Sequence, residues 1–180
     1  MALSAAGCDT LGNKIMDTVK GEVTVACPKA NIIADAVRRL QYREGSGRDL
    51  TDIDNEITIK QVTVGCKSKI DRDTRSGKVS ASINLDLTIS RGPANKDRFV
   101  DFGYFVAVTD LADKVLYREG LNEKVVFAEN QTRLEYESGA IILDIPIQAG
   151  QTGDNYRILV GMQLTRDQLK LNRIDRRPGL

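Results

Sequence analysis

Paired carboxylates are the residues of this sequence whose spacing comes nearest to a catalytic arrangement. Asp52 with Asp54, and Asp71 with Asp73, are each separated by one residue, and neighbouring carboxyl groups can act as general acid and general base. Such pairs could serve a hydrolase-type enzyme. Aspartates are also common in turns, because their side chains bond to the nearby backbone, and no nucleophile–base pair accompanies these four. We therefore expect them to be turn residues and expect the chain not to be an enzyme.

The stretch 71–77 also begins Asp-x-Asp, as calcium-binding loops do. Arg72 and Arg75 would repel a cation, and the closing bidentate Glu of such a loop is missing. The sequence has no histidine, which removes the usual zinc ligand and general base. We expect no metal and no cofactor.

Two groups of charged residues could bind a partner. Arg48 and Asp49 lie in the glycine-containing stretch 44–51, which predicts a loop. Arg173, Arg176 and Arg177 belong to a basic tail that could contact phosphates or an acidic partner. In both places the alternative is a set of solvated surface charges. A net charge of +1 indicates no basic field for nucleic acid, and no apolar run approaches the roughly 18 residues of a membrane-spanning helix.

The three cysteines divide into one near the N-terminus and two beside predicted strands. Cys8 follows Leu-Ser-Ala-Ala-Gly, small residues that resemble the lipobox of bacterial lipoproteins, in which the cysteine carries the lipid. The alternative is an ordinary N-terminus rich in small residues. If lipid occupies Cys8, a single disulfide between Cys27 and Cys66 in an oxidising envelope is the simple pairing. The other possibility is a pair of free thiols in a cytosolic core.

The strongest structural signal is the stretch 79–90, in which every odd residue is apolar and every even residue is polar. Side chains of a strand alternate between two faces, so this period predicts one long strand with one buried face. A phase slip near Lys60 and Gln61 predicts a β-bulge in a second strand over 56–66. With apolar residues on both faces, 99–109 predicts a central strand. Further short strands are predicted over 23–27, 115–117, 125–127, 133–136, 140–147 and 156–164.

Many short strands without βαβ alternation predict an antiparallel β-sandwich, for which we favour the immunoglobulin-like type. For 31–42 we favour a short helix or irregular segment over a first edge strand with a local irregularity. Thr165 and Gln168 form a capping box that predicts a short helix over 166–173. The expected organisation is a lipobox-like N-terminus and tether over 1–22, the sandwich over 23–165, and the helix with its basic tail over 166–180.

Several phrases of the sequence resemble one family. They are Ala26-Cys27-Pro28 with 33–36 and 47–52, the run Tyr104-Phe-Val-Ala-Val-Thr-Asp110, and the run from Tyr156 to Thr165. Together they look like uncharacterised lipoproteins of alphaproteobacteria, a likeness that covers most of the chain beyond Val25. The resemblance implies an envelope location and a cysteine anchor, and it implies no particular function.

These observations favour a non-catalytic envelope lipoprotein that faces the periplasm and is anchored by lipid on Cys8. It would act as an accessory or scaffold subunit, with an envelope protein complex or an outer-membrane protein as its partner. The first alternative is a repeating surface or fibre subunit that exposes a sheet edge for strand addition. An enzyme needs a deep pocket with convergent polar groups, whereas a binding module should show a shallow apolar patch or a free sheet edge.

Overall fold

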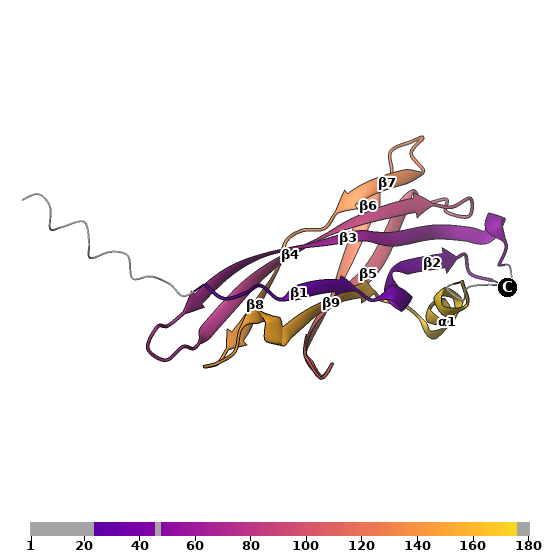
Figure 1. Cartoon of the computed structure of the whole chain (residues 1–180). Helices are drawn as coiled ribbons and strands as arrows, with labels where there is room; N and C mark the ends of the chain where they lie inside the picture. The colour runs from indigo at the N-terminus through magenta and orange to yellow at the C-terminus, as the bar shows by residue number, and fades with distance from the viewer. Residues whose placement is uncertain (1–23, 46–47, 176–180) are drawn as a thin grey trace, which may run out of the picture.

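The computed structural model describes residues 24–45 and 48–175, which form two β-sheets packed face to face and one short helix near the C-terminal end (Figure 1). One sheet has the strand order β1-β9-β5-β6, and the other has the order β2-β3-β4-β7, with β8 also paired to β4. The predicted β-sandwich with a C-terminal helix is confirmed. The elements are β1 (Lys29–Ile32), η1 (Ala34–Ala36), β2 (Arg38–Tyr42), η2 (Leu50–Asp52), β3 (Ile53–Ile70), β4 (Gly77–Arg91), β5 (Phe99–Asp110), β6 (Val115–Val126), β7 (Arg133–Glu137), β8 (Ile141–Ile147), η3 (Gly153–Asn155), β9 (Tyr156–Met162) and α1 (Arg166–Asp175).

Strand β4 is the centre of its sheet. It pairs with β3 on one side and with both β7 and β8 on the other. All of its odd apolar residues are buried, as the alternation predicts: Val79, Ala81, Ile83, Leu85, Leu87 and Ile89. They face the apolar side chains of the opposite sheet in one continuous core.

The predicted bulge lies in β3. Ile59 pairs with Leu87 and Gln61 pairs with Asp86, so Lys60 is an extra residue in the ladder. One extra residue reverses the faces of the strand beyond it. Before the bulge the odd-numbered Ile57 and Ile59 face the core, and beyond it the even-numbered Val62, Val64 and Cys66 do. Both parts of β3 therefore contribute to the core.

The first part of the described chain differs from two predictions. The predicted strand over 23–27 is wrong for its described residues, because the first strand, β1, begins only after Pro28. The preference for a short helix or irregular segment over 31–42 is also wrong. This stretch is an edge strand interrupted by η1: β1 pairs in parallel with β9, and β2 pairs antiparallel with β3 of the other sheet. The turn at η1 moves the chain between sheets, and this explains why Ala36 and Leu40, four residues apart, are both buried.

The hairpin β5–β6 is longer than the sequence predicted. Two short strands, 115–117 and 125–127, were expected where β6 runs without interruption along β5. The predicted central position of β5 is confirmed, since it lies between β9 and β6. The immunoglobulin-like detail is not confirmed by this strand order, because the second and third strands, β2 and β3, are neighbours in one sheet, whereas the second and third strands of that fold lie in different sheets.

Helix α1 begins where the capping box predicts. The Thr165 N–H donates to Gln168 Oε1 (2.9 Å), and the Gln168 N–H donates to Thr165 Oγ1 (3.2 Å). These bonds satisfy backbone donors that the first turn of a helix leaves free. Among the described residues, no helix has the length and apolar character needed to cross a membrane.

Candidate functional site

Three of the charged residues predicted to bind a partner lie at the end of the sandwich that carries α1. Arg48 pairs with Asp167 at the start of the helix (3.6 Å), and Arg173, near the end of the helix, pairs with Asp35 (2.9 Å). Asp49 caps η2 and accepts hydrogen bonds from Thr51, which lower the pKa of its carboxyl group below the usual value. Arg176, Arg177 and Cys8 lie outside the described residues.

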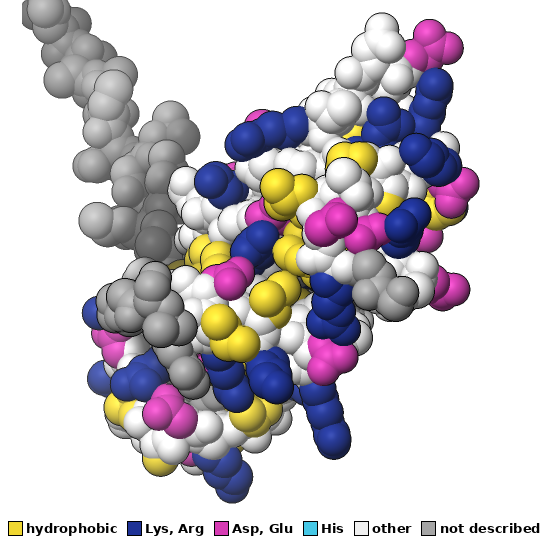
Figure 2. Space-filling model, turned by 90° about the vertical axis from the view of Figure 1, so that its right-hand side faces the viewer, with side chains coloured by type: hydrophobic (Ala, Val, Ile, Leu, Met, Phe, Trp, Pro, Cys, Tyr) yellow, Lys and Arg dark blue, Asp and Glu magenta, His cyan; other side chains and the backbone are white. Residues whose placement is uncertain are grey.

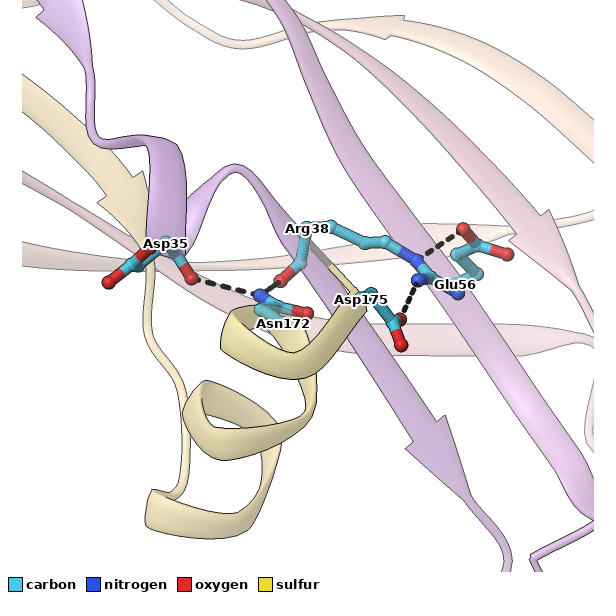
Figure 3. Close-up of polar contacts among 5 residues, drawn as sticks. All are labelled: Asp35, Arg38, Glu56, Asn172 and Asp175. Carbon is cyan, nitrogen blue, oxygen red and sulfur yellow. Dashed lines mark hydrogen bonds and ion pairs between the residues drawn. The ribbon is translucent and has the colours of Figure 1, made fainter. Parts of the chain in front are cut away.

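The contacts of α1 are mainly structural. Asn172 is buried, and its Nδ2 donates to the backbone oxygens of Asp35 (2.9 Å) and Arg38 (2.6 Å), as Figure 3 shows. Arg38 in turn binds Asp175 of the helix (3.0 Å) and Glu56 of β3 (2.6 Å). The helix therefore covers the crossing from η1 to β2 and fixes it.

The outer surface at this end is mixed in character. Figure 2 shows Lys and Arg side chains interspersed with acidic and hydrophobic ones, without a field of one sign. A hollow of about 210 Å³ lies between β2 and the start of α1, with Arg48, Asp167 and Leu171 among its walls. Arg48 and Arg173, the two predicted binding arginines among the described residues, each have a carboxylate partner, so the arrangement matches solvated ion pairs more closely than a preformed anion site.

Three of the four paired carboxylates, those of Asp52, Asp54 and Asp71, have hydrogen-bond or ion-pair partners. Asp52 is buried against Arg43 (2.5 Å), and Asp54 accepts from Asn55 (2.6 Å) and Asn95 (3.3 Å). Asp71 accepts from the backbone of Asp73 and Thr74, and these bonds lower the pKa of the Asp71 carboxyl group. The carboxylates of Asp52, Asp54 and Asp71 therefore hold turns together. Within the described ranges, His, Cys, Asp and Glu nowhere gather in a group of three that could hold a metal ion.

The cysteine pair forms the expected disulfide. Cys27 and Cys66 are bonded, with their Cα atoms 5.7 Å apart. Cys27 precedes β1 of one sheet and Cys66 lies on β3 of the other, so the bond ties the two sheets together along one edge of the sandwich.

The opposite edge of the sandwich is open over half its length. There the outermost strand of one sheet, β6, faces the outermost strand of the other, β8, across a groove of about 520 Å³. The floor consists of side chains that belong to the core, and the rim is formed by side chains that are about half exposed or more. The floor residues are Val108, Leu143, Ile145 and Tyr156, and the apolar rim residues are Leu116, Tyr117 and Ile142.

The groove exists because a strand of the opposite sheet covers only the C-terminal half of β6. At its C-terminal half β6 lies against β7, where the hydroxyls of Tyr104 and Tyr136 both donate to Glu123 (3.2 Å each) and join the two sheets. At its N-terminal half all six residues from Val115 to Gly120 are exposed. A smaller hollow of about 270 Å³, between Leu121 and Ile141, continues the groove toward the closed half.

Electrostatics differ between the two halves of this edge. Burial, reinforced by the negative charge of Glu123, raises the pKa of the Tyr104 phenol well above its usual value, so the phenol in the closed half stays a neutral hydrogen-bond donor at ordinary pH. On the open half, Asp144 also lines the groove, and its charge is paired with that of Lys78 (2.5 Å). The groove itself is therefore mostly apolar and carries little net charge.

The two edge strands that border the groove are not equivalent. Pro146 deprives β8 of one N–H group, a feature by which natural sheets blunt an edge. Strand β6 has no proline among its twelve residues. Among the described residues no strand pairs with its outer side, which can therefore offer an uninterrupted row of backbone donors and acceptors to an added strand.

In comparisons of the sequence and of the fold, no family model, no curated protein and no solved structure matches the chain.

The groove was not predicted from the sequence, although two of its signals were present. Val115, Leu116 and Tyr117 are three consecutive apolar residues, which does not suit a strand with one wet face. Pro146 interrupts an otherwise alternating strand and is typical of an edge. Neither signal says that the two edges face each other, because that depends on the strand order of both sheets.

Proposed function

We propose that this chain is a non-catalytic accessory or scaffold subunit that binds a protein partner at the bacterial envelope, held at the membrane by a lipid on Cys8. Its partner contributes an extended segment that lies in the groove and adds to β6 as a further strand. The observation that carries the proposal is the groove itself, with a floor of core side chains and, beside it, the strand β6, whose outer side pairs with no other strand among the described residues. Apolar surface next to a free sheet edge is the feature that recognises extended peptides.

The Cys27–Cys66 disulfide supports the location, since such bonds persist in oxidising compartments such as the bacterial periplasm. The lipid on Cys8 is tested by the intact mass of the natively expressed protein, with and without reductant. A species that begins at Cys8, carries added acyl mass and gains two hydrogens on reduction is expected. An unmodified chain with three free thiols would refute both the anchor and the location.

Binding in the groove is tested with a photo-crosslinking amino acid placed at Leu116 in cells. Leu50, which is 79% exposed and lies outside the groove, is the matched control position. We expect a protein adduct at position 116 and none at 50. The substitution Ile142→Glu should lower the adduct yield about tenfold, because it places a charge where apolar burial contributes about 1.5–3 kcal/mol per side chain. Equal adducts at both positions, or no effect of Ile142→Glu, would count against the proposal.

A further inference from the structure

The groove has the length of a short strand. Its fully exposed border on β6, Val115 to Gly120, is six residues long, which corresponds to about 20 Å of extended chain. Apolar side chains line only one side of the vacant strand position, since the other side faces solvent. An ideal occupant is therefore about six residues long, alternates between apolar and polar residues, and contains no proline.

A segment of this chain outside the described residues has that pattern. Thr18-Val-Lys-Gly-Glu-Val23 has valines at positions 19 and 23 with Gly21 between them, and polar residues at 18, 20 and 22. The alternation continues through Thr24 to Val25, which packs against the sandwich core. The segment is six residues long and, when extended, also spans about 20 Å.

The segment cannot easily reach the groove of its own molecule. Cys27 is fixed to β3 by the disulfide and lies two residues before the start of β1. Strands β1 and β6 are the two outermost strands of the same sheet, with β9 and β5 between them. The vacant position beyond β6 is therefore four strand spacings of about 4.8 Å from β1, or about 19 Å. Val23 is four residues before Cys27, and a fully extended chain of that length covers only about 14 Å without going around the sheet. The groove of a second copy is subject to no such limit.

We infer that the groove between β6 and β8 receives residues Thr18–Val23 of a second copy of this chain, which add to β6 as a strand. This inference rests on the proposed function, that the groove binds an extended protein segment, and names the segment. The donor strand and the acceptor groove are different surfaces, so the contact is heterologous. Repetition of such a contact builds a ring or an open filament rather than a closed twofold dimer.

The experiment uses the purified full-length chain with a photo-crosslinking amino acid at Leu116, as a mixture of ¹⁴N- and ¹⁵N-labelled protein. Irradiated adducts are digested and mapped by mass spectrometry. We expect adducts that join peptides of unlike isotope, with position 116 on one side and residues 18–23 on the other. A synthetic peptide of residues 14–25 should compete, and a peptide of the same composition in shuffled order should not.

Matched variants of the donor segment sharpen the test. Val23→Ser removes an apolar side chain from the face toward the groove and should lower the adduct yield about tenfold. Glu22→Ser changes the opposite face and should leave the yield within about twofold. Adducts confined to chains of the same isotope, or equal effects of the two substitutions, would overturn the inference.

The inference and the proposed function fail in different ways. If the purified chain forms no adduct at position 116 while the same position captures another protein in cells, the proposed function stands and the inference is wrong. If position 116 forms no adduct in either setting, both are wrong. Sedimentation of the full-length chain gives an independent check, because Leu116→Glu should abolish any assembly whose size grows with concentration.

Discussion

Loss of the disulfide between Cys27 and Cys66 should destabilise the whole sandwich. The bond closes a loop with a sequence separation of 39 residues, which contains β1 of one sheet and β2 of the other. In the chain-entropy model a loop of this length costs the unfolded state about 13 cal/mol/K, or about 4 kcal/mol at 25 °C. For a domain of this size, that corresponds to a fall in Tm of about 8–16 °C.

The assay is urea denaturation followed by far-UV circular dichroism, because the chain has no tryptophan for fluorescence. A Cys8→Ser background prevents thiol exchange with the pair. Reduction of this protein and the double substitution Cys27→Ala with Cys66→Ala should give the same loss of unfolding free energy, and reductant should not affect the double variant.

A loss below about 1 kcal/mol would refute the reasoning. It would mean that the bond restrains only residues 24–28, which precede β1, and that the rest of the loop is already constrained in the unfolded state. A loss seen with reductant but not with the double variant would instead point to a chemical effect of the reductant elsewhere.

Two further predictions concern buried polar groups. Asn172→Ala should lower the unfolding free energy by about 1–3 kcal/mol, because it leaves the backbone oxygens of Asp35 and Arg38 without their donor. Lys170→Ala, on the exposed side of α1, is the control in the same urea titration. Equal losses of unfolding free energy in the two variants would contradict the role of Asn172 in holding α1 on the sandwich. The native fold raises the pKa of Tyr104, so the native state holds a proton that the unfolded state releases near pH 10. Stability should therefore fall as the pH rises above about 10, and the fall should be smaller in Tyr104→Phe. The measurement is the urea midpoint between about pH 8 and 11. The same dependence of this midpoint on pH in both proteins would contradict the prediction.

The parts of the fold that the sequence predicts well are those in which one periodicity decides burial. In β4 an unbroken alternation places all of its odd apolar residues in the core, and no other register would bury the same set. The bulge at Lys60 is predictable for the same reason, since the alternation of apolar and polar residues resumes after one extra residue. The helix α1 can be predicted from its capping box, because that signal depends only on residues close together in the sequence.

Prediction fails where the chain changes sheets. Residues 29–42 serve one sheet through β1 and the other through β2, and the turn η1 between them rotates the buried direction. The resulting spacing of Ile33, Ala36 and Leu40 imitates a helix. Local periodicity cannot separate these two cases, because the difference lies in which strands, distant in sequence, the two halves pair with.

The candidate binding groove was missed because it is a property of two strand orders at once. Strand β6 ends one sheet and β8 ends the other, and only the assembled sandwich brings the two free edges together. Among the described residues singled out in the sequence, Asp71 instead holds a turn, and Arg48 and Arg173 form ion pairs at helix α1. In a chain without histidine, the types of the charged residues give little indication of where a binding site lies. The stronger guide is the stretch from Val115 to Gly120, where β6 has a partner strand on one side only within the described part of the chain.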